Sequence, residues 1–239
     1  MSDQISFSGF LVILYGPMFS GKTSELIKRL SQHSDIFSSQ IKFSKPPLYV
    51  CHVFDLERTE SPSNSSTIKD TSEPSSPNCL SQLRRSESNG TPYSHATRFK
   101  GVPDNIDSVF AAKLSDVDIE GRHIIGVDEA QFFDDLELVN SWVDKGITVI
   151  AAGLHANYEG KKFGKILDMI PNADDSVFLP AVCYYCVMEN KGVLRMDRLH
   201  NMKASHTVKI SESKELIDPG AIKDYRPACR SHHKQHSKH

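Results

Sequence analysis

The feature that most constrains this chain is the stretch Gly16–Thr23, GPMFSGKT, which matches the phosphate-loop pattern G-x-x-x-x-G-K-[ST] in full. The apolar run Leu11–Tyr15 precedes it and predicts a buried parallel strand. Leu26 and Leu30 follow at helical spacing, so a helix is expected from Lys22 to about residue 32. A strand, a glycine-rich turn and a helix N-terminus together form an anion site. This context favours nucleoside-triphosphate binding over a chance glycine-rich turn.

The chemistry assigns a role to each part of this loop. Lys22 is expected to reach the β- and γ-phosphates, and Thr23 to place its hydroxyl on Mg²⁺. Backbone N–H groups that turn inward around the phosphates complete the predicted ATP site, formed by Gly16, Pro17, Met18, Phe19, Ser20, Gly21, Lys22 and Thr23.

A second motif, Ile124–Gln131 (IIGVDEAQ), consists of four apolar residues followed by acids, as in a Walker B strand. Ligands bind at the carboxyl edge of such sheets, so Asp128 is expected to hold Mg²⁺. Glu129, one residue on, would orient a nucleophile beside the γ-phosphate and take its proton. The alternative is a solvated acid pair at a strand end, which the neighbouring phosphate loop makes the weaker interpretation.

The rest of the chain indicates an α/β fold. Apolar strands are predicted at 48–54, 123–127 and 148–154, and helices at 104–114, 134–145 and 163–170. This alternation predicts a mostly parallel sheet flanked by helices, with right-handed crossovers. From about Ala181 short strands at 192–196 and 207–210 and a group of cysteines predict a small β module.

Composition sets further bounds. The formal net charge of -2 argues against nucleic-acid or membrane-surface binding, and no apolar run could span a bilayer. Five cysteines without a secretory signal favour the cytoplasm. Residues 59–94 are rich in Ser and Pro and are interpreted as a disordered insertion, in which Cys79 is an idle thiol. The expected organisation is a tail at 1–9, a kinase-type domain at 10–180, a zinc-binding module at 181–232 and a tail at 233–239.

Two C-x-x-C/H knuckles predict a structural zinc site. They are Cys183-Tyr-Tyr-Cys186 and Cys229-Arg-Ser-His232, and two such pairs are what tetrahedral zinc requires. His233 competes for the fourth position, and spacing favours His232. Three buried cysteines with a tail histidine are the less favoured alternative, and four protein ligands leave no open position for catalysis.

These residues together resemble the type II thymidine kinases, a zinc-containing cytosolic family with a RecA-like P-loop domain and a lasso loop. The matching stretches are GPMFSGKTSELIKRL, GVDEAQFF, AAGL with KKFGKIL beyond it, and the two knuckles with Tyr225 before the second. They cover most of residues 10–54 and 95–232. The Met-Phe pair in the loop, DE-x-QFF and the knuckle spacing are specific as a set.

The resemblance implies ATP- and Mg²⁺-dependent phosphorylation of the 5′-hydroxyl of thymidine, and of deoxyuridine, by a homotetramer in nucleotide salvage for DNA synthesis. By position, Glu129 matches the general base and Arg58 an arginine near the reacting phosphates. Tyr225 lies in the lasso loop that grips the base. The other positions matching the surroundings of the thymine ring are Met18, Phe132, Leu154, Tyr158 and Phe163.

Three features depart from the family pattern. His155 stands where an acid is common, and the lasso sequence DPGAIKDY has one glycine where a pair is usual. The insertion at 59–94 falls in a loop that is shorter in the family.

Two other classes compete with the kinase interpretation. A zinc-ribbon nucleic-acid-binding NTPase would need a basic stripe, and the candidate run is Arg195, Arg198, His200 and Lys203. A scaffold that binds ATP without turnover is the weaker possibility.

Overall fold

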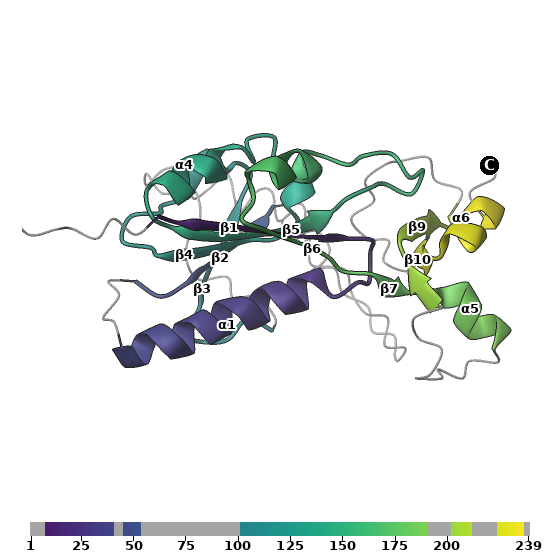
Figure 1. Cartoon of the computed structure of the whole chain (residues 1–239), viewed down its shortest axis with the longest axis horizontal. Helices are drawn as coiled ribbons and strands as arrows, with labels where there is room; N and C mark the ends of the chain where they lie inside the picture. The colour runs from purple at the N-terminus through teal and green to yellow at the C-terminus, as the bar shows by residue number, and fades with distance from the viewer. Residues whose placement is uncertain (1–7, 41–44, 54–100, 191–201, 212–223, 237–239) are drawn as a thin grey trace, which may run out of the picture.

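The computed structural model describes residues 8–40, 45–53, 101–190, 202–211 and 224–236. Within them a six-stranded sheet forms the centre of the molecule (Figure 1). Its strands are β1 (Phe10–Gly16), β2 (Leu48–His52), β3 (Asp107–Ala111), β4 (Ile124–Val127), β5 (Thr148–Leu154) and β6 (Asp175–Phe178). The elements between them are the helices α1 (Lys22–Gln40) and α4 (Leu138–Asp144) and the 3-10 turns η2 (Leu114–Asp116), η3 (Ala130–Phe132) and η4 (Ile166–Asn172).

All six strands run parallel, in the order β3-β2-β4-β5-β1-β6. β5 therefore lies between β1, which leads into the phosphate loop, and β4, which ends in Asp128. Because the strands are parallel, their carboxyl ends meet at one edge of the sheet, where ligands bind in such folds. The expected parallel α/β sheet is confirmed.

Helices cover both faces of the sheet, with α1 on one side and α4 on the other (Figure 1). Side chains alternate along β1: Leu11 and Ile13 join the core beneath α4, while Val12 and Leu14 join the core beneath α1. Gly126 in β4 lets α1 approach closely, since a Cβ there would lie 2.7 Å from Leu30 Cδ1. The near-continuous apolar strands thus reflect burial on both faces.

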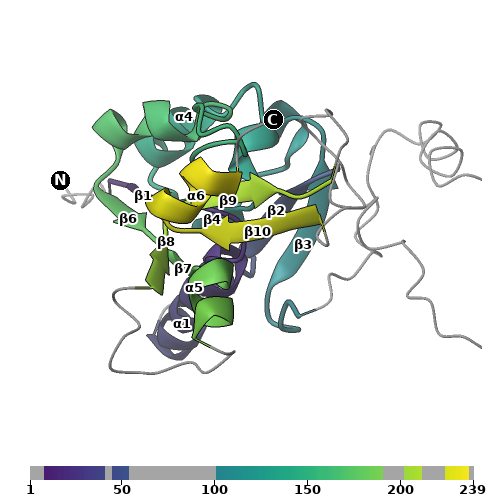
Figure 2. The ribbon, with the colours of Figure 1, turned by 90° about the vertical axis from the view of Figure 1, so that its right-hand side faces the viewer.

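A smaller module lies beyond the carboxyl edge of the sheet (Figures 1 and 2). It pairs β7 (Ala181–Val182) with β8 (Lys203–Ala204), and β9 (His206–Lys209) with β10 (Tyr225–Ala228), both antiparallel. Two short helices, α5 (Tyr184–Glu189) and α6 (Arg230–His236), complete the described part. The Met18 backbone N–H donates to Thr207 Oγ1 over 3.1 Å, which joins the phosphate loop to this module.

The expected helix at 104–114 is wrong. Residues 107–111 form edge strand β3, paired with β2 from Leu48↔Asp107 to His52↔Ala111. The i, i+4 spacing of Ile106, Phe110 and Leu114 suggested a helix, but a short apolar run does not distinguish the two periods, and strand pairing decided the outcome.

Other boundaries also moved. The helix expected at 134–145 is limited to Leu138–Asp144, and that at 163–170 is a 3-10 turn, Ile166–Asn172, which contains Pro171. α6 continues through His236, into the stretch expected to be a tail. The insertion at 59–94 and the strand expected at 192–196 lie outside the described residues.

The packing of α1 on the sheet gives a first prediction. Leu30 is fully buried against β4, so Leu30→Ala should lower the free energy of unfolding by about 2–5 kcal/mol, measured by chemical denaturation. Gln32→Ala on the exposed side of the same helix should change it by less than about 0.5 kcal/mol. Equal effects of the two variants would contradict the assigned packing face.

Candidate active site and metal centre

The phosphate loop connects the end of β1 directly to the start of α1. Phe19 and Gly21 have φ angles of 63° and 80°, in the left-handed region, so the chain reverses tightly before the helix begins. Lys22 is buried, and its Nζ donates to Pro17 O over 2.7 Å and to Ser20 Oγ over 3.3 Å. A lysine ammonium and the first turn of a 19-residue helix thus converge on the loop, as anion binding requires.

Asp128 is buried at the end of β4 and accepts hydrogen bonds from β2 and from the phosphate-loop motif. Tyr49 Oη in β2 donates to Asp128 Oδ2 over 2.6 Å, and the Thr23 side chain also hydrogen bonds to this carboxyl. Burial and the neighbouring Glu129 raise the pKa of Asp128 to about 6, although the hydrogen bonds from Tyr49 and Thr23 oppose the shift. The two residues predicted to hold Mg²⁺, Thr23 and Asp128, are therefore in contact.

This donor set fits Mg²⁺. A carboxylate and a hydroxyl are hard oxygen ligands, and a desolvated carboxylate gains most from a nearby cation. Tyr49 could not be identified from the sequence, because nothing about a tyrosine in an apolar strand shows that its hydroxyl donates to Asp128.

Glu129 follows in an unusual backbone conformation. Its φ and ψ are 50° and 39°, left-handed for a residue with a side chain. Gln131 Nε2 donates to Glu129 Oε2 over 2.6 Å, and Gln131 Oε1 accepts from the Leu154 backbone N–H over 2.8 Å. The candidate base at the tip of β4 is thereby connected to the tip of β5.

The residues expected around the nucleobase form two groups. Phe132 and Phe163 make an edge-to-face pair with centroids 5.6 Å apart, close to the Gln131 and Leu154 contact. Tyr158 and Tyr225 flank Lys209, whose Nζ lies 5.4 Å and 5.7 Å from the two ring centroids. Met18 lies near the second group, because its backbone N–H donates to Thr207, two residues before Lys209. Arg58 lies outside the described residues.

The four predicted zinc ligands come together. Their ligand atoms all lie within 4.8 Å of one another. His232 Nδ1 is 3.4 Å, 3.5 Å and 3.2 Å from the sulfurs of Cys183, Cys186 and Cys229, and the Cys186 and Cys229 sulfurs are 4.0 Å apart. A tetrahedral zinc ion would separate such ligand atoms by about 3.5–3.8 Å, whereas a disulfide needs about 2.05 Å. This Cys₃His cluster is compatible with zinc.

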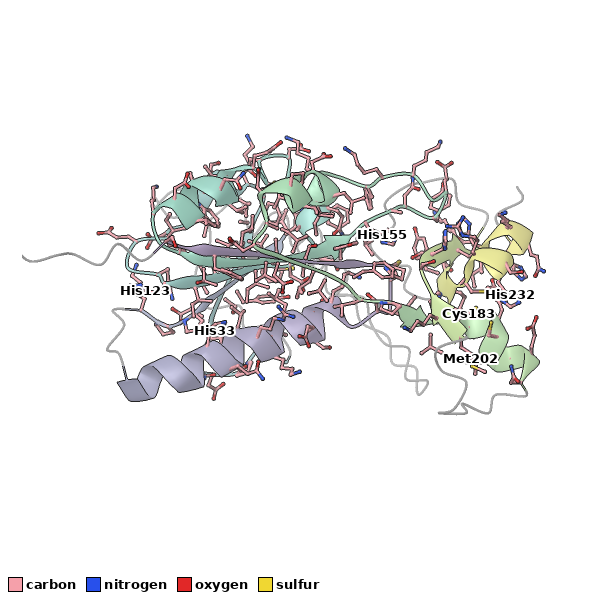
Figure 3. All side chains as sticks on the ribbon, in the orientation of Figure 1. His33, His123, His155, Cys183, Met202 and His232 are labelled. Atoms are coloured by element: carbon pink, nitrogen blue, oxygen red, sulfur yellow. The ribbon has the colours of Figure 1, made fainter. Side chains whose placement is uncertain are left out.

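Neighbouring groups distinguish the two candidate histidines. His232 Nε2 is 2.8 Å from Glu189 Oε1, so Nδ1 faces the sulfurs, as in metal-bound histidines held by a carboxylate. His233 turns away, with Nε2 3.0 Å from Tyr158 O and its ring 4.6 Å from His206. The arrangement favours His232 as the fourth ligand. Figure 3 shows His232 and Cys183 in the small module, beyond the sheet edge where His155 lies.

Protons compete with a metal at this cluster. Burial and the neighbouring thiols raise the pKa of Cys186 to about 12. Burial opposes charge on His232, but its hydrogen bonds to Glu189, Cys183 and Cys229 raise the pKa to about 9. Because zinc binds thiolates and neutral imidazole, its binding would release protons and weaken as the pH falls.

Several functional candidates were missed from the sequence. Gln131 belongs to the DE-x-QFF motif, but the sequence assigns it no role. Thr207 and Lys209 are polar residues of β9, a strand that matches no recognised functional pattern. Glu189 lies three residues after Cys186, a spacing that on a short helix turns it toward the metal centre.

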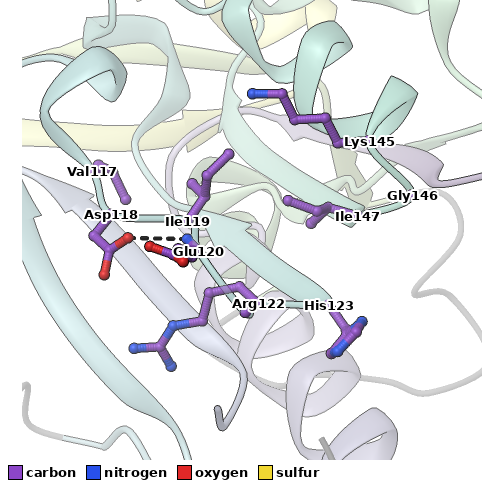
Figure 4. A pocket seen from close by; sticks show the side chains of 10 residues that line it. Val117, Asp118, Ile119, Glu120, Arg122, His123, Lys145, Gly146 and Ile147 are labelled. Carbon is purple, nitrogen blue, oxygen red and sulfur yellow. Dashed lines mark hydrogen bonds between the residues drawn. The ribbon is translucent and has the colours of Figure 1, made fainter. Parts of the chain in front are cut away.

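A separate hollow lies at the opposite edge of the sheet. Ten residues at the amino ends of β4 and β5 line about 560 Å³, with Lys145 and Arg122 on opposite sides of Ile119 and Ile147 in Figure 4. Arg122 donates to Asp107 Oδ2 over 2.6 Å and Lys45 to Asp118 Oδ2 over 2.8 Å. Arg122 and Asp118 thus line the hollow, but each is paired with an oppositely charged side chain of the same chain. Within the described ranges, none of the helices has the length and apolar character needed to cross a bilayer.

Fold and site together define an α/β protein of the P-loop type with a Cys₃His cluster. The family model "Thymidine kinase" matches residues 95–233. A thymidine kinase of Thermococcus kodakarensis is 30% identical over 231 residues, covering 94% of each chain. Those of Ureaplasma parvum and Ureaplasma urealyticum are 29% identical, over 95% of this chain and 83% of theirs. The chain belongs to the thymidine kinase family.

The burial of Asp128 predicts a pH-dependent cost. Its pKa is higher in the folded than in the unfolded chain, so ionisation destabilises the fold increasingly from pH 4 to about pH 6 and constantly above that. Asp128→Asn should therefore stabilise the ligand-free protein by about 3 kcal/mol at pH 8, a difference that vanishes toward pH 4. Denaturation at both pH values measures this.

Asp134→Asn removes an exposed carboxylate six residues away and should change stability by less than about 0.5 kcal/mol. An Asp128→Asn protein no more stable than wild type at pH 8 would disprove the desolvation of this carboxyl.

The cluster geometry predicts a metal dependence. Cys229→Ser leaves three of the four ligands, so zinc content should fall well below one ion per chain and the melting temperature should drop. Cys79→Ser changes a cysteine outside both knuckles and should retain zinc. Full zinc occupancy in Cys229→Ser, measured by metal analysis, would remove Cys229 from the site.

Proposed function

We propose that this protein is an ATP-dependent thymidine kinase that transfers the γ-phosphoryl group of ATP to the 5′-hydroxyl of thymidine, and of deoxyuridine, in the salvage of nucleosides for DNA synthesis. The observation that carries the proposal is the contact of the phosphate loop with Asp128, beside Glu129, in a chain of the thymidine kinase family. A phosphate loop with an adjacent carboxylate needs an acceptor, which in a nucleoside kinase is a hydroxyl in place of the water of an ATPase, and the neighbouring rings suit a flat nucleobase.

The loop and Lys22 would bind the phosphates of ATP. Backbone N–H groups of residues 16–23 and the α1 N-terminus hold the β- and γ-phosphates, and Lys22 exchanges Pro17 O and Ser20 Oγ for phosphate oxygens. Thr23 and Asp128 would hold Mg²⁺, which when bound neutralises charge on the β- and γ-phosphates. Arg58 is proposed to approach the same oxygens, as the family resemblance implies.

Glu129 would act as the general base. As the thymidine 5′-oxygen forms its bond to the γ-phosphorus, the bond from that phosphorus to the β,γ-bridging oxygen breaks and ADP leaves. The hydroxyl proton passes to the Glu129 carboxylate, giving dTMP. The protein supplies position and charge, which is where catalysis of phosphoryl transfer arises.

The nucleoside would lie between the sheet edge and the small module. Phe132 and Phe163 offer one pair of rings, and Tyr158 and Tyr225 another. Met18, on the loop that follows β1, and Leu154, the last residue of β5, complete the proposed apolar surroundings of the base. Aromatic rings and a methionine suit a planar base with a methyl group.

The zinc ion is proposed to be structural. Cys183, Cys186, Cys229 and His232 would fill its tetrahedral positions, so none remains for a water or substrate. Cys229 follows β10 directly, and β10 begins at Tyr225. Zinc would thus fix one stem of the lasso loop and reduce the entropy lost when thymidine binds.

The nucleic-acid-binding alternative is not favoured. Arg195, Arg198 and His200 of its candidate stripe lie outside the described residues, and Lys203 lies in β8. Family membership points to a small nucleoside instead.

Domain organisation, assembly and location complete the proposal. Residues 10–180 would form the kinase domain and 181–232 the zinc-binding lasso domain of a cytoplasmic homotetramer.

Glu129→Gln tests the proposed base. The variant keeps the size of the side chain and removes its basicity, so kcat should fall about 10²–10⁴-fold while ATP and thymidine affinities stay near wild type. A coupled ADP-release assay with ATP and each deoxynucleoside, together with binding titrations, measures both.

The exposed acid variant Glu120→Gln is the matched control and should be as active as wild type. Wild-type kcat in Glu129→Gln would exclude Glu129 as the base, and wild-type protein inactive toward thymidine would refute the proposed function.

A further inference from the structure

Gln131 is a buried amide held at both ends. It is 4% exposed and lies in the η3 turn two residues after Glu129. Its side chain spans the distance between the Glu129 carboxylate, at 2.6 Å, and the Leu154 backbone N–H, at 2.8 Å.

The chemistry of these two partners fixes the orientation of the amide. A backbone N–H can only donate, so the atom facing Leu154 must be the amide oxygen. The NH₂ group is then directed at Glu129, where an ionised carboxylate can only accept. Glutamine satisfies both partners at once. An ionised glutamate would satisfy only the Leu154 N–H, and an apolar residue of similar length would satisfy neither.

The surrounding backbone leaves this side chain little freedom. A Cβ at Gly153 in β5 would lie 2.7 Å from Gln131 Oε1, and one at Gly164 would lie 2.1 Å from Gln131 O. Gly153 therefore lets β5 approach the side-chain amide of Gln131, and Gly164 lets the loop before η4 approach its main chain. Main chain and amide are thus both closely packed, which restrains the position of the hydrogen-bond partner as well.

Glu129 needs such a restraint. Its left-handed backbone conformation is disfavoured for a residue with a Cβ, and such conformations persist where surrounding contacts impose them. The Glu129 backbone N–H donates to Asp128 Oδ1 over 2.9 Å, which holds the main chain, while Gln131 holds the carboxylate.

We propose that Gln131 is the positioning residue of the general base: its amide, held by the Leu154 N–H, fixes where the Glu129 carboxylate lies relative to the acceptor hydroxyl. The assignment rests on the proposed function. It also gives the tip of β5 a role in catalysis, because the Leu154 N–H sets the direction in which the amide points.

Two variants separate this role from simple packing. Gln131→Glu keeps the shape and the acceptor for Leu154, but it replaces the NH₂ group that donates to Glu129 with a carboxylate oxygen, which repels the Glu129 carboxylate. Gln131→Met keeps the length, adds no charge and removes both hydrogen bonds. Gln32→Glu, exposed on α1, introduces the same charge change as a matched control.

The experiment measures kcat, KM for ATP and thymidine, and the melting temperature of the full-length variants at one pH. A positioning role predicts that Gln131→Glu and Gln131→Met lower kcat about 10- to 100-fold while both KM values stay near wild type. A packing role alone would lower the melting temperature without lowering kcat of the folded protein. Gln32→Glu should match wild type.

The outcomes are distinguishable. An active wild type together with wild-type kcat in a folded Gln131→Glu protein overturns the positioning role alone. If Gln131→Glu does not fold, wild-type kcat in Gln131→Met overturns it. A wild type that phosphorylates no nucleoside overturns the proposed function and this assignment with it.

Discussion

The contact of Asp128 with Thr23 and Tyr49 is the interaction on which the site depends. It joins three segments that are far apart in sequence: the start of α1, the end of β4 and the middle of β2. A buried carboxylate is costly unless it is hydrogen bonded or close to a cation, and here Tyr49 and Thr23 supply hydrogen bonds. The remaining cost of burying Asp128 would be relieved by the Mg²⁺ that we propose binds there.

The parallel sheet makes this convergence possible. Because β5 separates β1 from β4, the phosphate loop and the acids flank the tip of one strand, and Leu154 at that tip contacts Gln131. Three glycines let neighbouring segments approach: Gly126 beneath α1, and Gly153 and Gly164 around Gln131. Rigid strands and close packing hold polar groups more accurately than loops could.

The small module closes the same edge from outside. Its Cys₃His cluster brings β7, α5, β10 and α6 together, and among the described residues the apolar cluster of this module centres on Ala181, Cys183 and Ala204. A small core of this kind would gain much of its order from the zinc ion that we propose. The hydrogen bond from the Met18 backbone N–H to Thr207 Oγ1 links this module to the phosphate loop.

The sequence by itself determined the features that are local in the chain. The phosphate loop, the IIGVDE strand and the two knuckles are defined by spacing, and each folds where its pattern lies. Tertiary structure decided what depends on partners distant in sequence. Residues 107–111 became a strand because β2 offered its backbone edge, and His232 rather than His233 faces the sulfurs because Glu189 holds its other nitrogen. Tyr49, Gln131 and Lys209 acquired candidate roles only when folding placed them beside Asp128, Glu129 and the two tyrosines. Such pairings are set by packing across the sheet, which no local pattern of residues records.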